Sequence, residues 1–273
     1  MHRHNSFILI CCVLLIFVSG CTPEAAEAVI SAEDLVSTMA AHTLEAWSQN
    51  TPGPDPAEGP STEVTQNPPD PVETLSRPTA DATGGPLPDS FYIWDIWGHR
   101  QYFGLGCEAS ATVDWADYFG VTVSEFSFQM RLPLSDNPDK GFVGSVDGPW
   151  GQVPPYAYGV HAAPVAQVLR EHYGMNAAGE KGLTIEDLKR EIASGQPVIA
   201  WVIGNCVGGI PHEYIDEEGD SVTVAAYEHV VILTGYNEET IRYMNNGRFY
   251  DIPYENFANT WSVLGNMAVF LDD

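Results

Sequence analysis

One cysteine, Cys107, has the sequence setting of a nucleophile, because it stands where a helix is expected to begin. Gly104 and Gly106 precede it and allow sharp backbone turns. Apolar residues spaced three and four apart then predict an amphipathic helix over residues 109–119, with Gly120 as its C-cap. Because free amides and the positive end of the helix dipole favour a thiolate, we expect Cys107 to be reactive. A buried structural cysteine is the alternative.

A thiol that attacks an acyl carbon needs a base, a group that orients the base, and donors for the oxyanion. His229 begins a β-branched run and is the candidate base, with a purely structural histidine as the alternative. Asn245 ends the next predicted strand after a short turn, so it could accept an N–H from the His229 ring. The pair Asn246-Gly247 that follows it is also typical of a simple turn, since Asn-Gly favours positive φ.

The elements that must hold these groups follow one another as helices first and strands later. The predicted helices are residues 109–119, 161–174, 184–195 and 254–264. The predicted strands are residues 197–203, 229–236, 240–245 and 267–271. This order favours an α+β fold, with N-terminal helices packed on a C-terminal antiparallel sheet, over a wound parallel sheet. A long turn-rich stretch, residues 132–159, is typical of a functional loop and could wall a cleft.

The N-terminal third of the chain has the composition of an export signal followed by a spacer. Residues 1–20 read as a signal peptide, and their apolar run is too short for a comfortable membrane span. The Val-Ser-Gly-Cys sequence that ends at Cys21 resembles a bacterial lipobox. We therefore expect Cys21 to carry a lipid that anchors the protein to the extracytoplasmic face of the cell membrane; an ordinary signal peptide with a chance cysteine is the alternative. Residues 21–89 are Pro-rich and predict a disordered tether, which leaves residues 90–273 for the folded domain.

The charge of the chain limits the classes of partner. Its 273 residues include 37 acidic and 11 basic side chains, for a formal net charge of -26. Sequence-independent binding to nucleic acid is not expected, because the positive charge that neutralises phosphates is lacking. Solubility accounts for the acidity. We expect a monomer.

Neither a cofactor nor a metal is expected. The side chains that could form a metal site match no familiar ligand spacing; they are His161, His172, His212 and the acidic run 216–220. A different alternative to catalysis is a disulfide, since an exported protein could join Cys107 to Cys206 and so block the nucleophile.

Six ordered segments of the chain resemble the bacteriocin-processing, double-glycine type cysteine peptidases, and most closely their stand-alone exported relatives in the papain-like clan. The resemblance covers about residues 95–271. Its segments are Gln101 with Gly106-Cys107-Glu108-Ala109-Ser110, Tyr158-Gly159-Val160 with Pro164-Val165-Ala166, Gly195-Gln196-Pro197-Val198-Ile199, Glu228 to Tyr236, Phe257 and Trp261.

This resemblance implies a papain-like fold that hydrolyses peptide or other amide bonds of a peptide or protein substrate through an acyl-thioester. It implies that Cys107 is the nucleophile, that His229 is the general base, and that Gln101 completes the oxyanion hole with the cysteine backbone amide. The family usually has an Asp that orients the histidine. Here an ungapped count gives Asn245 and a one-residue slip gives Asn246; Asn suffices in papain-like enzymes. A catalytically silent peptide-binding module of the same fold and a disulfide-held structural domain are the other hypotheses.

Overall fold

A computed structural model describes residues 85–272 of the chain. The predicted signal peptide, the predicted lipidation site at Cys21 and almost all of the predicted tether lie outside these residues. None of the helices in the described part combines the length and the apolar character that a membrane span needs.

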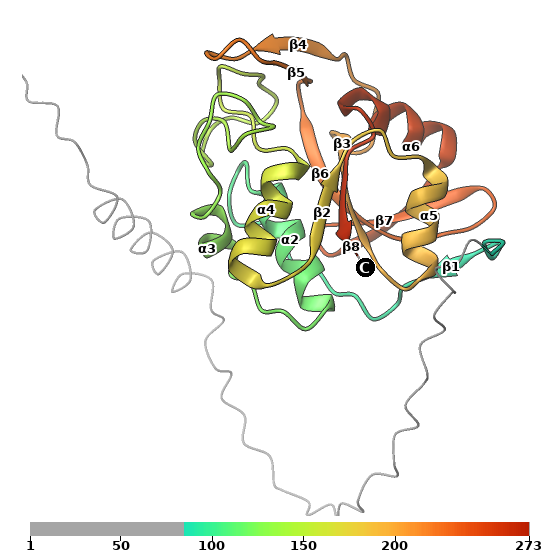
Figure 1. The fold of residues 1–273 in the computed structure, drawn as a ribbon. Helices are drawn as coiled ribbons and strands as arrows, with labels where there is room; N and C mark the ends of the chain where they lie inside the picture. The colour runs from blue at the N-terminus through green and yellow to red at the C-terminus, as the bar shows by residue number, and fades with distance from the viewer. Residues whose placement is uncertain (1–84, 273) are drawn as a thin grey trace, which may run out of the picture. The chain divides into compact units, whose positions relative to one another are not determined.

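The described residues form a mixed α and β structure (Figure 1). The helices are α2 (Cys107–Tyr118), α3 (Glu125–Gln129), α4 (Ala162–Tyr173), α5 (Ile185–Ala193), α6 (Tyr254–Trp261) and the 3-10 turn η1 (Ser262–Leu264). The strands are β1 (Phe91–Tyr92), β2 (Ala177–Glu180), β3 (Val198–Ile203), β4 (His212–Ile215), β5 (Ser221–Val224), β6 (Glu228–Tyr236), β7 (Thr240–Asn245), β8 (Arg248–Pro253) and β9 (Ala268–Leu271).

Most strands join one antiparallel sheet. Its order is β2-β9-β3-β6-β7-β8, with β1 paired to β6, and these strands pair antiparallel. Strands β4 and β5 form a separate hairpin. The predicted α+β class with an antiparallel sheet is therefore confirmed.

Strand β6 lies at the centre of the core. Figure 1 shows α2 and α4 on one side of the central strands and α5 and α6 on the other. Because helices cover both faces of the sheet, all nine residues of β6 are buried, including Glu228 and His229 at its start. A polar side chain at this end of β6 is therefore held in a dry environment, where its protonation depends strongly on its neighbours.

Helix α2 is anchored against the same part of the sheet. Trp115, at its middle, is fully buried, and its Nε1 donates a hydrogen bond of 2.6 Å to the carbonyl of Pro197 just before β3. The helix begins after Gly106, whose carbonyl accepts from the Ser110 N–H at 2.9 Å. A Cβ at Gly106 would come within 2.9 Å of Phe103 Cβ, so the tight approach of the incoming chain requires glycine here.

Several short elements were not predicted from the sequence. These are α3 and the strands β1, β2, β4, β5 and β8. Strand β8 follows a two-residue turn at Asn246 and Gly247, with φ of 50° and 71°, and pairs with β7. The sequence of this strand contains Arg, Asp and a terminal Pro, which are not typical of a strand. The hairpin turn, and not side-chain propensity, therefore determines that β8 forms. The predicted helix at 161–174 appears as α4, with His161 as its N-cap.

Candidate active site

Cys107 is the first residue of α2, as the glycine and helix pattern predicts. Its side chain is 7 % exposed, and it lines a cavity together with Gln101, His229 and Asn245. Residues more than a hundred positions apart in the sequence thus meet at one site, because α2 packs against the beginning of β6.

The ring of His229 contacts Asn245. The Nε2 atom of His229 lies 3.0 Å from Asn245 Oδ1, and an amide oxygen can only accept, so Nε2 carries the proton and donates it. The other ring nitrogen, Nδ1, is then an unprotonated acceptor. Burial lowers the pKa of His229, and the bond to Asn245 offsets part of this effect. The ring is consequently a neutral base at neutral pH.

The register of the sheet explains why Asn245, and not its neighbour, reaches the ring. In the antiparallel pairing of β6 with β7, Ile232 lies opposite Met244, so the next residues along, Val231 and Asn245, lie opposite each other. Side chains two apart on a strand share a face, which puts His229 diagonally beside Asn245. The alternative left open by the sequence, Asn246, lies beyond the strand.

Asn246 has a supporting position that sequence reasoning missed. Its Oδ1 accepts the backbone N–H of Gln101 at 3.0 Å, and its Nδ2 donates to Asn245 Oδ1 at 3.0 Å. One exposed side chain therefore links the loop that carries Gln101 to the residue that holds His229. The left-handed backbone at Asn246 is what directs its side chain back toward this loop.

Gln101 lies at the cavity, but its amide is already engaged. Its Nε2 donates to the carbonyls of Phe103 at 2.9 Å and Gly104 at 3.3 Å. An amide nitrogen has two hydrogens, so donation to an oxyanion requires one of these bonds to open, and the longer bond to Gly104 is the weaker.

A second set of side chains, also missed in the sequence, holds the backbone before the cysteine. His99 Nδ1 lies 2.6 Å from Asp114 of α2 and its Nε2 lies 2.9 Å from Glu125 of α3. The Tyr102 N–H also donates to Glu125, at 3.0 Å. Although burial alone lowers the pKa of His99, its hydrogen bonds to the two carboxylates raise it. The only feature of the sequence that could have pointed to this set is Asp114, because it lies two helical turns after Cys107 in the predicted helix.

The cavity continues outward as an open cleft of about 440 Å³. Aromatic side chains flank it, including Tyr102 beside the cysteine loop and Trp150 from the predicted functional loop 132–159. The Trp150 indole lies edge-on to the His229 ring with a centroid distance of 6.2 Å. Arg100 is the only lysine or arginine among its lining residues.

The protonation of Cys107 differs from the expectation of a reactive thiolate. Burial raises the pKa of the Cys107 thiol, and the carboxyl groups of Glu108 and Glu228 raise it further. Its Sγ donates a hydrogen bond of 3.1 Å to Glu108 Oε2. The resting site therefore pairs a neutral thiol with a neutral imidazole.

The disulfide of the alternative hypothesis is not formed in this structure, where Cys107 and Cys206 are both free thiols. Burial raises the pKa of Cys206 to about 11, so it is an unreactive thiol as well. Three carboxylates of the acidic run 216–220 contact a lysine side chain of the same chain. Lys140 Nζ lies 2.6 Å from carboxylate oxygens of Asp216, Glu218 and Asp220.

A family model described as the Peptidase_C39 like family matches residues 94–269. The chain belongs to this family. A solved structure described as that of a C39-like peptidase from Bacillus anthracis is similar over 68 % of this chain and 98 % of its own, with a TM-score of 0.60 and 21 % identity. This C39-like peptidase domain thus has the predicted papain-like fold.

Two more distant structural neighbours of the C39-like domain are cysteine proteases. Xylellain from Xylella fastidiosa is 12 % identical over 68 % of this chain and 87 % of its own, with a TM-score of 0.43. A cysteine protease from Carica candamarcensis is 15 % identical over 68 % of this chain and 99 % of its own, with a TM-score of 0.42. A search of curated proteins gave no match.

Proposed function

We propose that the C39-like domain is a cysteine peptidase that hydrolyses peptide bonds of peptides or proteins through an acyl-thioester. The observation that carries this proposal is the shared cavity: Cys107 at a helix start faces the same space as a histidine whose Nε2 is fixed by Asn245. Family membership supports a peptidase and a peptide or protein substrate.

In the proposed reaction His229 Nδ1 takes the proton of Cys107, and the sulfur attacks the scissile carbonyl carbon. The resulting oxyanion is held by the backbone N–H of Cys107 and by Gln101 Nε2 once its bond to Gly104 opens. The imidazolium then gives its proton to the leaving amine, which departs and leaves an acyl-thioester. A water molecule that gives its proton to His229 hydrolyses the thioester, releases the acid product and restores the thiol.

The test is cleavage of a proteome-derived peptide library by the full chain. We expect cleavage products that disappear in Cys107→Ala and in His229→Ala. Cys206→Ser is the matched control, because it removes the other described thiol and should retain the products. Identical product profiles for the native chain and Cys107→Ala would refute peptidase activity and favour the catalytically silent peptide-binding module.

We also propose that the domain is held at the extracytoplasmic face of the cell membrane by a lipid on Cys21. The support is the Val-Ser-Gly-Cys sequence after an apolar run and the Pro-rich spacer that follows. When the full chain is expressed in bacteria fed a labelled fatty acid, we expect labelling that Cys21→Ser abolishes and Cys12→Ser leaves intact. Equal labelling of both variants, or none in the native chain, would refute the anchor.

A further inference from the structure

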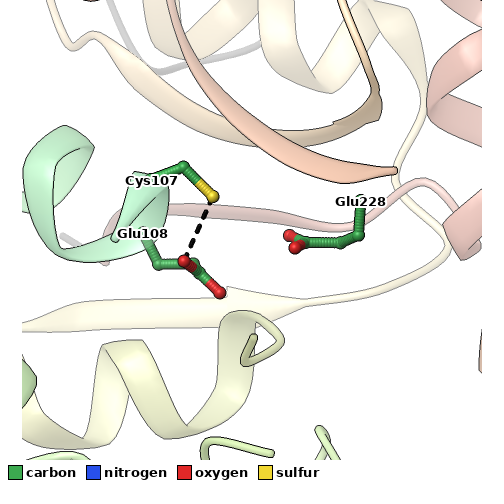
Figure 2. A group of neighbouring side chains, drawn as sticks. All are labelled: Cys107, Glu108 and Glu228. Carbon is green, nitrogen blue, oxygen red and sulfur yellow. Dashed lines mark hydrogen bonds between the residues drawn. The ribbon is translucent and has the colours of Figure 1, made fainter. Parts of the chain in front are cut away.

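Two carboxyl groups that the proposed reaction does not use lie beside the sulfur of Cys107. Figure 2 shows Glu108 and Glu228 pointing toward each other and toward the sulfur. The Cys107 Sγ donates to Glu108 Oε2 at 3.1 Å, and one carboxyl oxygen from each glutamate lies within 4.8 Å of the sulfur and of the other. We call Glu108 and Glu228 the acid pair.

The acid pair is sealed from solvent. Glu108 is 1 % exposed and Glu228 is 2 % exposed. A Cβ at Gly159 would come within 2.4 Å of Glu108 Oε1 and 2.9 Å of Glu228 Oε2, so the backbone of the loop before α4 closes directly over both carboxyls. The Val160 N–H donates to Glu108 Oε1 at 2.6 Å. Glu228 Oε1 is buried with no hydrogen-bond partner.

The described part of the chain gives the acid pair no cationic partner. Among residues 85–272, no Lys, Arg or His forms an ion pair with either carboxyl. The loop over the pair contributes Tyr158, whose pKa burial raises, and His161, whose pKa burial lowers. The Nδ1 of His161 lies 2.6 Å from Asp139, which also pairs with Lys181 at 2.6 Å, so the charges on this side belong to a separate ion pair. Helix α2 contributes the neutral thiol, and β6 contributes the neutral ring of His229. Two adjacent carboxylates with no cation would leave two uncompensated buried charges, so a bound proton must remove at least one.

We propose that Glu108 and Glu228 hold one proton between them at neutral pH and thereby keep Cys107 as a protonated, unreactive thiol. Glu228, which has no donor for its buried oxygen, is the neutral acid. Glu108, which accepts from Val160 N–H and from the thiol, is the ionised member. When Glu108 takes up a second proton from solvent, the thiol loses both its acceptor and the adjacent negative charge. Its proton can then pass to His229 Nδ1 and form the thiolate–imidazolium pair.

Glu108 is thus a positioning residue that acts through Cys107. The role rests on the proposed thiol chemistry, but it predicts a property of the sulfur that needs no substrate. Burial raises the pKa of Glu108 to about 7, so the change from unreactive to reactive thiol should fall near neutral pH. Ionisation above that pH should slow reaction of the thiol with electrophiles, the reverse of an ordinary cysteine.

The test is the rate at which iodoacetamide alkylates Cys107 in the full chain between pH 5 and 9, read by mass mapping of the peptide that contains it. We expect the native rate to fall as pH rises through about 7. Glu108→Gln should lose this fall and react about tenfold or more faster at pH 8, equivalent to at least one pKa unit at the sulfur. Glu228→Gln is the matched control, because it replaces a neutral acid by a neutral amide of the same size and should keep the fall.

Three results would overturn the proposal: Glu108→Gln with the native profile, Glu228→Gln without the fall, or a native profile that changes when EDTA removes metal. A measurement on the native chain guards against misfolded variants. With ¹³C-labelled Glu, NMR should show one side-chain carboxyl that titrates near pH 7 and one that stays protonated at that pH. Titration of every Glu carboxyl below pH 5.5 would refute the acid pair. These readouts are independent of peptide cleavage, so absence of cleavage would refute only the peptidase.

Discussion

The hydrogen bond between His229 and Asn245 offers a direct measurement on the proposed base. Replacing Asn245 with Asp keeps the shape of the side chain and puts a negative charge on the oxygen that lies 3.0 Å from Nε2. An opposite charge at this distance favours the imidazolium and raises a histidine pKa by about 1–3. Asn245 is only half-buried, so part of this effect is screened by water and an increase of about 1–2 is expected. That is roughly 1.4–3 kcal/mol of added preference for the charged ring.

The assay is an NMR titration of the His229 ring in the native chain and in Asn245→Asp. Burial lowers the native pKa of His229, and the variant should raise it. Asn246→Asp is the control: the same charge one residue on is exposed, and it should change the His229 pKa by much less. An unchanged titration in Asn245→Asp, or equal shifts in both variants, would refute the contact on which the base assignment depends.

Three further outcomes follow from the packing and the cleft. Trp115→Ala should lower the free energy of unfolding by about 3–5 kcal/mol in urea titrations, whereas Trp97→Ala, 79 % exposed, should change it by less than about 0.5 kcal/mol. Gly159→Ala should cost more stability than Gly120→Ala, since both have positive φ but only the Cβ at Gly159 would collide with the acid pair; equal losses would contradict that packing. If the peptidase proposal holds, Arg100→Glu should lower kcat/KM for peptides with acidic residues relative to matched basic peptides, and an unchanged ratio would show that Arg100 does not contact substrate.

The long periodic helices and strands were predictable from the sequence, and so were the reactive residues at their ends. The helix after Cys107 has apolar residues at helical spacing, the strand after His229 begins with an uninterrupted apolar run, and a short turn fixes β7 antiparallel to β6. A strand period of two then decides between Asn245 and Asn246 once the register is known. The register itself depends on tertiary packing, and for that reason the sequence left both residues open.

The supporting side chains could not be predicted, because their partners are brought in by the fold. Glu125 lies on a five-residue helix with no periodic signal, yet it contacts the ring of His99, twenty-six residues away. Asn246 shows only the pattern of a turn, and its link to Gln101 spans 145 residues. Each contact joins two segments that are far apart in the sequence. Neither secondary-structure propensity nor local residue spacing indicates that they meet. The sequence located the reacting groups more readily than the groups that hold them.

The protonation of the thiol shows which of two electrostatic effects dominates at this helix start. The helix terminus favours a thiolate by about 0.3–1 kcal/mol, and by about 2 kcal/mol at most. A carboxylate 3–5 Å from the sulfur opposes it by roughly 3–5 kcal/mol at an effective dielectric constant near 20. Because the residue directly after Cys107 is Glu108, the larger effect is built into the same turn of helix as the smaller one. Removing the charge of Glu108 should therefore lower the pKa of the Cys107 thiol, with burial of the sulfur left as the main effect that opposes the thiolate.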